Sequence, residues 1–156
     1  MKLSKNNFGR SYNQFKIGQK IKHWPRKTIS DSEHSLFCLI TMNHHPIHID
    51  EIFAKKSKFK KRLVVGTYVF SLIVGMTVRD ISGKAIANLN YEKINHYAPV
   101  YNGDTLSAYS TIVSKQASKS NKLNAKVKIM TTAQNQKKEK VLSFYRTILI
   151  KKWKIN

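Results

Sequence analysis

The sequence predicts one α+β domain in which an antiparallel sheet wraps around a central apolar helix. The chain has 156 residues, a length that suits a single domain, and we place that domain over residues 1–156. Its longest apolar run extends from Val64 to Val78 and has the length of a buried helix. After this run, apolar and polar residues alternate, which is typical of antiparallel strands with one buried face.

The apolar run begins after the basic cluster Lys60-Lys61-Arg62 and ends before Arg79-Asp80. Apolar side chains occur all round the expected helix, so we expect it to be enclosed on every side. Such a helix spans only about 20 Å, whereas a bilayer core is roughly 30 Å thick, and we therefore expect no membrane span. Gly66 falls in the first turn, where backbone N–H groups lack intrahelical partners and the helix dipole favours negative charge.

The composition is strongly basic, with a formal net charge of +21. Such a field attracts polyanions, and both nucleic acid and a thioester with a nucleotide tail, such as coenzyme A, fit that description. Lys and Asn are scattered through the whole chain, so a general compositional bias explains the charge equally well. No helix-turn-helix, zinc-finger or RNP-like pattern occurs, and we expect no specific nucleic-acid binding.

The chain contains one cysteine, Cys38, which lies in an apolar run and suits the protein core. A chain with one cysteine forms no internal disulfide, which fits a reducing compartment. The N-terminus also lacks an apolar stretch of the signal-peptide kind, so we expect a cytoplasmic protein.

The elements expected before the apolar run are short. Residues 1–14 read as a loosely ordered lead-in, and residues 15–23 alternate weakly, as a strand would. Ser30 or Asp31 is placed to cap a helix, with Glu33 in its first turn. These signals predict a strand and then a helix in the first 40 residues.

The rest of the first half contains a proline-bent loop and a further short helix. Pro46 indicates a turn or an extended path, and Asp50 can cap a helix over residues 51–56. Beyond the apolar run, strands are expected over residues 85–91, 105–115, 123–129 and 141–150. Arg146 lies in the otherwise apolar last strand and should have a partner, because an unpaired buried charge is costly.

The densest cluster of catalytic residue types is the stretch Asn43-His44-His45-Pro46-Ile47-His48-Ile49-Asp50. One interpretation is a polar loop in which the histidines are incidental. A second is a metal site, but Pro46 argues against a helix that would align ligands at i and i+4, and no helical His-Glu-x-x-His pattern occurs. We therefore predict no metal site here.

A third interpretation comes from motifs spread over the chain. The loop Pro46-Ile47-His48 is followed by Ala54, by Val65-Gly66 at the helix start and by the turn Gly103-Asp104-Thr105. In this combination the chain resembles the MaoC-like dehydratase family, which includes (R)-specific enoyl-CoA hydratases, and within it the mesaconyl-CoA hydratase and methylmalyl-CoA dehydratase branch. The resemblance runs from about Phe8 to the last strand. It implies a hot-dog fold, in which an antiparallel sheet encloses a central helix.

The hydratase motif of that family reads Asp-x-Asn-Pro-(apolar)-His. Laid on this sequence, its His falls on His48, its apolar residue on Ile47 and its Pro on Pro46, while His45 stands in place of the Asn. The family's Asp falls on Asn43, and this departure affects the chemistry, because an amide cannot take up a proton as a carboxylate does.

The resemblance implies reversible hydration of an α,β-unsaturated acyl-CoA thioester, in which the Asp and His hold the water. Here His48 is the expected acid/base, Asn43 orients the water, and the Gly66 amide stabilises the charge on the thioester oxygen. Val65, Thr67 and Tyr68, with His45, are expected to line the substrate site. No metal or redox cofactor is implied, and coenzyme A enters only as part of the substrate.

Three alternatives remain open at this point. Asn43 also fits a catalytically impaired protein that binds an acyl thioester, and other hot-dog proteins hydrolyse thioesters. The positive charge leaves a weak, salt-sensitive association with nucleic acid as the third.

A lone hot-dog domain has an exposed sheet edge, so we expect a homodimer. The family branch alone suggests a short branched or dicarboxylic acyl group such as mesaconyl.

Overall fold

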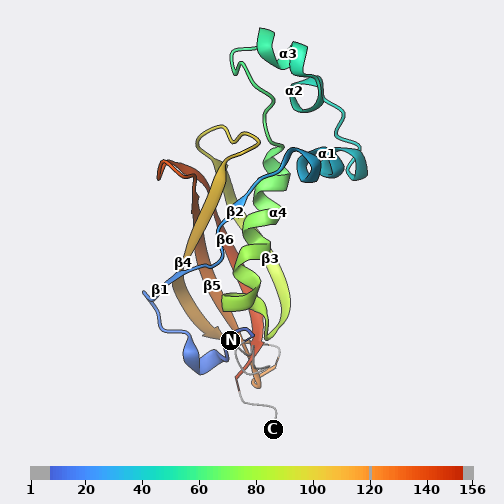
Figure 1. Ribbon diagram of the computed structural model, residues 1–156. Helices are drawn as coiled ribbons and strands as arrows, with labels where there is room; N and C mark the ends of the chain where they lie inside the picture. Colours follow the sequence, from blue (N-terminus) through green and yellow to red (C-terminus); the bar gives the residue numbers. More distant parts are fainter. Residues whose placement is uncertain (1–7, 120, 153–156) are drawn as a thin grey trace.

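The computed structural model describes residues 8–119 and 121–152 (Figure 1). In chain order the elements are a 3₁₀ turn (Tyr12–Gln14), β1 (Lys20–Lys22), β2 (Lys27–Thr28), α1 (Asp31–Ile40), α2 (Pro46–Ile49), α3 (Glu51–Lys56), α4 (Gly66–Thr77), a π-helical turn (Val78–Ser82), β3 (Ala85–His96), β4 (Thr105–Ala117), β5 (Asn124–Gln134) and β6 (Lys140–Lys151). Helices dominate the first half and long strands the second, as the sequence predicts.

The strands form one antiparallel sheet in the order β1-β4-β5-β6-β3, with the short β2 also paired to β4. Ile129 of β5 lies opposite Ile112 of β4 on one side and Arg146 of β6 on the other. β6 in turn lies between β5 and β3 and is an interior strand, as its almost continuous apolar sequence predicts. Among the described residues, β3 pairs only with β6 and leaves its other edge unpaired.

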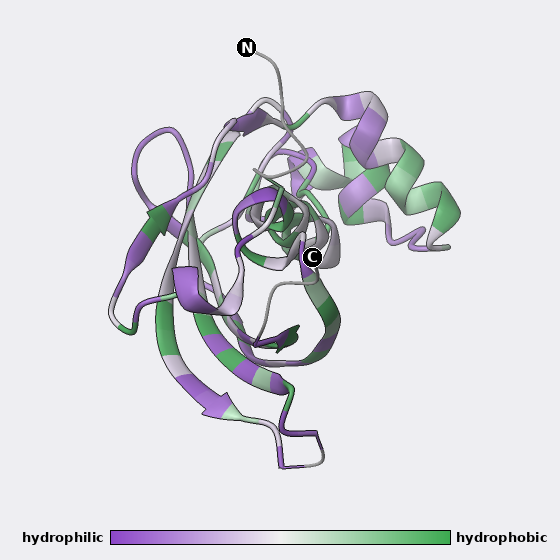
Figure 2. Ribbon diagram, turned by 90° about the horizontal axis from the view of Figure 1, so that it is seen from below, coloured by the Kyte–Doolittle hydropathy of each residue, from purple (hydrophilic) through white to green (hydrophobic). Residues whose placement is uncertain are grey.

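The sheet curves around α4, which lies against its concave face (Figures 1 and 2). Val69 and Ile73 of α4 are buried among Leu106 and Phe144 of the sheet. A second buried cluster, around Phe15 and the far ends of the strands, closes the other end of the sheet. The α+β architecture with a helix inside a curved antiparallel sheet is confirmed. None of the helices in the described ranges is both long enough and apolar enough to cross a membrane.

The prediction that α4 is enclosed on every side is wrong for this chain. Thr67, Ser71 and Gly75 recur every fourth residue, so they form one stripe along the helix, and all three are exposed. The sheet covers only one side of α4, while the stripe faces away from the core. The apolar run therefore does not distinguish a helix buried by its own chain from one with a face left open.

The caps expected in the first half are confirmed. Ser30 accepts the Glu33 N–H, and the Glu33 side chain accepts the Ser30 N–H, so a capping box begins α1. Asp50 accepts the N–H groups of the first turn of α3. Cys38 is fully buried, as predicted.

The expectation for Pro46 is wrong. This residue does not direct the chain into a turn or an extended path but opens the short helix α2, with His45 as its N-cap. Proline at the first helical position has a suitable φ, and its missing N–H would have had no intrahelical partner there. The strand expected over residues 15–23 is reduced to β1, because Gly18 has a φ of +80° just before it.

Residues 1–7 lie outside the described residues, so the loosely ordered lead-in can be followed only from Phe8. The Gly9 N–H donates to the Arg79 carbonyl at 2.7 Å. A side chain at Gly83 would overlap both the Phe8 ring and the backbone of Gly9, so glycine is needed at this crossing of two segments.

A buried polar network lies at the C-terminal end of α4. Arg146 is fully buried and donates from Nη2 to Thr77 Oγ1 at 2.9 Å, so the expected partner is a neutral hydroxyl, and among the described residues Nε and Nη1 have no hydrogen-bond partner. The Arg146 cation thus lies near the negative end of the helix dipole. Beside it, His23 contacts Asp80 through Nδ1 at 2.9 Å and Ser110 through Nε2 at 2.8 Å. The network ties β1, β4, β6 and the end of α4 together.

This network predicts that the free energy of unfolding falls as the pH drops below about 6.5, the ordinary pKa of histidine. Burial lowers the pKa of His23, although Asp80 opposes this shift. The unfolded chain therefore binds more protons than the folded chain below pH 6.5, so His23 contributes stability above this pH that is lost on acidification. The loss for one histidine is at most about 1.4 kcal/mol per pH unit.

Urea unfolding of the wild type near pH 7.5 and near pH 5.5 measures this loss. His23→Gln should show a smaller difference between the two pH values, because glutamine does not titrate. The matched control is His44→Gln, since His44 is exposed. A His23→Gln variant with the same pH dependence as the wild type would contradict the prediction.

Candidate active site

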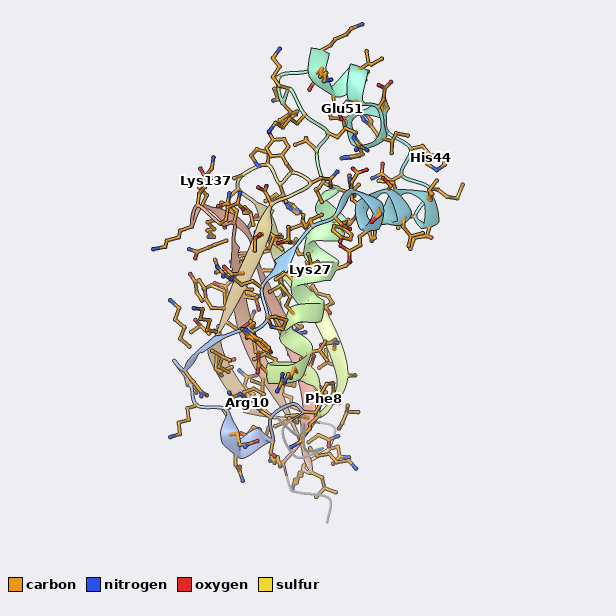
Figure 3. All side chains as sticks on the ribbon, viewed as in Figure 1. Phe8, Arg10, Lys27, His44, Glu51 and Lys137 are labelled. Carbon is orange, nitrogen blue, oxygen red and sulfur yellow. The ribbon has the colours of Figure 1, made fainter. Side chains whose placement is uncertain are left out.

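The histidine loop is joined to the segment that leads into α4. Helices α1, α2 and α3 project beyond one end of the sheet, and the chain returns from them into the N-terminus of α4 (Figure 1). Glu51 and His44 lie in this projecting part (Figure 3). The loop that contains His48 is therefore brought to the same end of the molecule as Gly66, although 17 residues separate them in the sequence.

The backbone of Leu63 joins the histidine loop to the segment before α4. Its N–H donates to the Ile47 carbonyl at 3.1 Å, and its carbonyl accepts a hydrogen bond from His48 Nδ1 at 2.8 Å. Because a carbonyl can only accept, His48 carries its proton on Nδ1 when neutral. Nε2 then has a free lone pair and can take a proton from water.

The next two residues are fixed in the same way. The Val64 N–H donates to the Val100 carbonyl at 2.8 Å, and the Val65 N–H donates to His34 Nε2 at 3.1 Å. The Val65 carbonyl accepts the Val69 N–H at 3.1 Å, which is the first hydrogen bond of α4. The chain is therefore held by hydrogen bonds up to the residue before Gly66.

Gly66 is the first residue of α4, so its N–H has no intrahelical partner and lies at the positive end of the helix dipole. His96, at the end of β3, lies against it. A methyl group added at Gly66 would be 3.1 Å from both Cε1 and Nε2 of the His96 ring. Partial burial lowers the pKa of His96, which favours its neutral form. The position thus combines an unpaired backbone donor with a neutral imidazole.

His34 projects from α1 toward the same segment and is fully buried. Its Nε2 lies 3.1 Å from the Val65 nitrogen and 3.6 Å from the Cys38 sulfur. Burial lowers the pKa of His34, and the neighbouring His48 and Arg62 lower it further. The His34 and His48 rings are perpendicular, with centroids 6.1 Å apart. His34, His48 and His96 thus surround the start of α4.

Asn43 and His45 are engaged in local backbone hydrogen bonds. Asn43 Oδ1 lies 3.5 Å from the His45 N–H, and His45 Nδ1 accepts the Ile47 N–H at 3.2 Å. The His45 ring lies 6.0 Å from that of His48. The loop therefore places His45 beside His48, and the role of Asn43 in orienting water stays a prediction.

The three residues expected to line the substrate site lie in different surroundings. Val65 is buried, while Thr67 belongs to the open stripe of α4. Tyr68 packs edge-on against Phe37 of α1 with ring centroids 5.2 Å apart, and also lies 6.1 Å from His34. Tyr68 thus joins α1 to α4, and only Thr67 projects from the first turn into the open.

Sequence reasoning missed His34 and His96. His34 lies in α1 at the i position relative to Cys38 at i+4, which shows that it shares a face with a core residue. His96 ends a strand, and nothing in its sequence neighbourhood reveals that β3 passes the helix start. Within the described ranges, no group of three or more His, Cys, Asp or Glu side chains has the arrangement of a metal site.

The contact between Gly66 and His96 generates a prediction. Gly66→Ala should push the exposed His96 ring outward by a few tenths of an ångström and let water reach it. The pKa of His96 should then rise toward its ordinary value of about 6.5, because the burial that lowers it is reduced. An NMR titration of the ring protons measures this change.

Gly75→Ala is the matched control, because a methyl group at Gly75 meets nothing within 4 Å. It should leave the His96 titration unchanged. An unaltered His96 pKa in Gly66→Ala would mean that the glycine does not determine how this imidazole packs.

Comparison with known proteins agrees with the arrangement. The family model of the MaoC-like domain matches residues 12–134 of this chain. The chain is 33% identical over 148 residues to a mesaconyl-CoA hydratase of Cereibacter sphaeroides, and 31% identical over 149 residues to a β-methylmalyl-CoA dehydratase of Chloroflexus aurantiacus. These alignments cover 95% and 96% of this chain, but only 43% and 42% of the relatives. The chain thus spans less than half the length of these relatives.

Solved structures of related proteins superpose on this chain as well. A MaoC domain protein dehydratase from Chloroflexus aurantiacus superposes with a TM-score of 0.91 at 30% identity, over 99% of this chain and 44% of that one. A Mycobacterium tuberculosis protein described as a double hot-dog fold superposes with a TM-score of 0.84 at 20% identity, over 95% of this chain and 47% of that one, which shows the fold alone. The fold is therefore a hot dog, and the chain belongs to the MaoC-like domain family.

Proposed function

We propose that the protein adds water reversibly to the double bond of an α,β-unsaturated acyl-CoA thioester. The observation that carries the proposal is the hydrogen bond from His48 Nδ1 to the Leu63 carbonyl. It orients the ring with a free Nε2 and ties it to the segment that leads directly into Gly66. A base and an unpaired backbone donor are thereby supplied at one helix terminus, as this reaction requires.

The proposed reaction needs two groups acting on opposite ends of the conjugated system. His48 Nε2 takes a proton from water as the water oxygen bonds to the β-carbon. The electron pair of the double bond moves toward the thioester, whose oxygen gains negative charge beside the Gly66 N–H. His48 then returns the proton to the α-carbon, which restores the thioester and completes the addition. Asn43 assists by orienting the water, since an amide can hydrogen-bond but cannot act as the base.

The substrate class follows from the named relatives and from charge. Relatives that match nearly the whole chain are named as mesaconyl-CoA hydratase and β-methylmalyl-CoA dehydratase, which favours a short branched dicarboxylic acyl group. The formal net charge of +21 favours a polyanionic carrier such as coenzyme A. Specific nucleic-acid binding, a metal and a redox cofactor form no part of the proposal.

Asn43 supports a second candidate, an acyl-thioester-binding protein that has lost the hydratase activity. Its side chain provides no carboxylate at the position where the family has one. The two candidates differ in a single measurement, namely whether the protein consumes an enoyl thioester or only binds it.

Hydration is measured as the fall in enoyl-thioester absorbance when the protein is added to mesaconyl-CoA or crotonyl-CoA. His48→Ala should lower kcat by about 100-fold or more, because general acid–base catalysis contributes roughly 10²–10⁴. Asn43→Asp should raise the rate if a carboxylate is what limits it. His44→Gln, in an exposed residue of the same loop, is the control and should leave the rate unchanged. A hydration rate that His48→Ala leaves intact would refute the assignment of His48.

A homodimer is part of the proposal. Within the part of the chain that the structure describes, one edge of β3 is unpaired, and its exposed apolar side chains include Ile86, Leu89 and Ile94, which are 49%, 44% and 43% exposed. The open stripe of α4, formed by Thr67, Ser71 and Gly75, is exposed as well. Small residues allow close approach of a second helix, and an unpaired strand edge can extend a sheet. A second copy related by a two-fold axis would cover both surfaces.

Gly75→Leu tests this arrangement. The added side chain meets nothing within 4 Å in the single chain, so the fold should tolerate it, and replacing a mid-helix glycine should stabilise α4 by about 1 kcal/mol. In a dimer the same side chain would stand between the two helices. Sedimentation equilibrium should therefore show a dimer for the wild type and a folded monomer for Gly75→Leu.

The control for this experiment is Leu123→Lys, at an exposed position between β4 and β5. It should leave the dimer intact. A wild-type monomer, or a Gly75→Leu variant as dimeric as the wild type, would contradict the proposed interface.

A further inference from the structure

His34 accepts a backbone hydrogen bond from the residue that precedes α4. This histidine is fully buried in α1, and its Nε2 is the acceptor for the Val65 N–H at 3.1 Å. The Cys38 sulfur lies 3.6 Å from the same nitrogen. Burial raises the pKa of the Cys38 thiol, which keeps its proton, so the thiol is a second donor to Nε2. Two donors at one nitrogen require that Nε2 carries a lone pair.

The tautomer follows from this arrangement. In a neutral imidazole one nitrogen donates and the other accepts, so the proton of His34 lies on Nδ1. Nδ1 is buried and has no hydrogen-bond partner among the described residues. A buried donor without a partner lowers stability, so packing alone does not account for a histidine here. The distinctive feature of the residue is the acceptor that it presents to Val65.

The position of that acceptor is what matters for the chemistry. Val65 is the residue before Gly66 and caps α4, so the orientation of the Val65–Gly66 peptide decides where the Gly66 N–H points. The preceding residues are held by Ile47, His48 and Val100. The Val65–Gly66 peptide itself is held through the Val65 carbonyl, which accepts the Val69 N–H, and His34 holds the preceding Val64–Val65 peptide through the Val65 N–H. Without the His34 acceptor, the Val65 N–H would be buried and unpaired, so the Val64–Val65 peptide would reorient and carry the first turn of α4, with the Gly66 N–H, out of position.

We propose that His34 is a positioning residue that fixes the direction of the Gly66 N–H through its hydrogen bond to Val65. The inference rests on the proposed function, in which the Gly66 amide stabilises charge on the thioester oxygen. Such a donor acts mainly in the transition state, because the oxygen is charged only there. Misplacing it therefore affects the chemical step more than substrate binding. The groups that face His34 are His48, Arg62 and Asp31, together with Tyr68 and Cys38.

The test compares His34→Leu, which removes the acceptor, with His34→Gln, whose amide oxygen can accept the Val65 N–H. With crotonyl-CoA as the probe, His34→Leu should lower kcat by about 10–100-fold, the loss expected when a catalytic group is misplaced by about 1 Å. KM should change little, and His34→Gln should recover most of kcat. His44→Gln is the control and should match the wild type. An unchanged kcat in His34→Leu, or equal losses in both His34 variants, would overturn the inference.

Amide NMR separates this inference from the proposed function. If the wild type does not hydrate the thioester, the proposed function fails, and the signals of Val65 and Gly66 still test the positioning. His34→Leu should expose the Val65 amide to hydrogen exchange and shift the Gly66 signal, while His34→Gln should preserve both. Unchanged Val65 and Gly66 signals in His34→Leu would overturn the inference.

The wild type alone provides a test that needs no variant to fold. The ring nitrogens of His34 should show the tautomer with the proton on Nδ1 in a long-range ¹H–¹⁵N spectrum. A proton on Nε2 would exclude the hydrogen bond from Val65 and overturn the inference directly.

Discussion

The site depends on how the chain enters α4. A helix N-terminus offers several unpaired N–H groups, but they are useful to a reaction only if their direction is fixed. In this protein the three residues before Gly66 are each held through a backbone polar group, by Ile47 and His48, by Val100, and by His34. Preorganisation of this kind means that a donor need not move when charge develops on a substrate. The remaining features of the site follow from the elements that supply those partners.

Those partners come from three separate parts of the chain, which explains what sequence reasoning found and what it missed. The capping box of α1, the cap at Asp50 and the helical nature of the apolar run are local signals, and the sequence predicts all three correctly. The motif around His48 was also visible. The roles of His34 and His96 depend on contacts across 31 and 30 residues, which no local pattern encodes.

Two errors have physical causes of the same kind. Pro46 was expected to prevent helix formation, yet at a first helical position its ring is favourable, and only the position of the N-cap distinguishes the two cases. The apolar run was expected to be buried on all sides, yet Thr67, Ser71 and Gly75 leave a narrow stripe of small residues uncovered. This chain covers less than half of each relative named above, and it likewise covers 47% of the protein described as a double hot-dog fold. An uncovered helix face is what a single hot dog should show if a second one normally packs against it.

In the proposed function, Asn43 stands where the hydratase motif has an Asp, and the loop geometry bears on this difference. Asn43 Oδ1 is turned toward the His45 N–H, an interaction across two residues that a carboxylate oxygen would make equally well. The loop can therefore keep its conformation with either Asn or Asp at position 43. What changes is the chemistry beside His48, because a carboxylate stabilises a protonated imidazole by Coulomb attraction while an amide offers only a dipole. In the proposed reaction, the identity of residue 43 would therefore act on proton transfer by His48, whereas stabilisation of the charged thioester oxygen would depend on the hydrogen bonds that hold the start of α4.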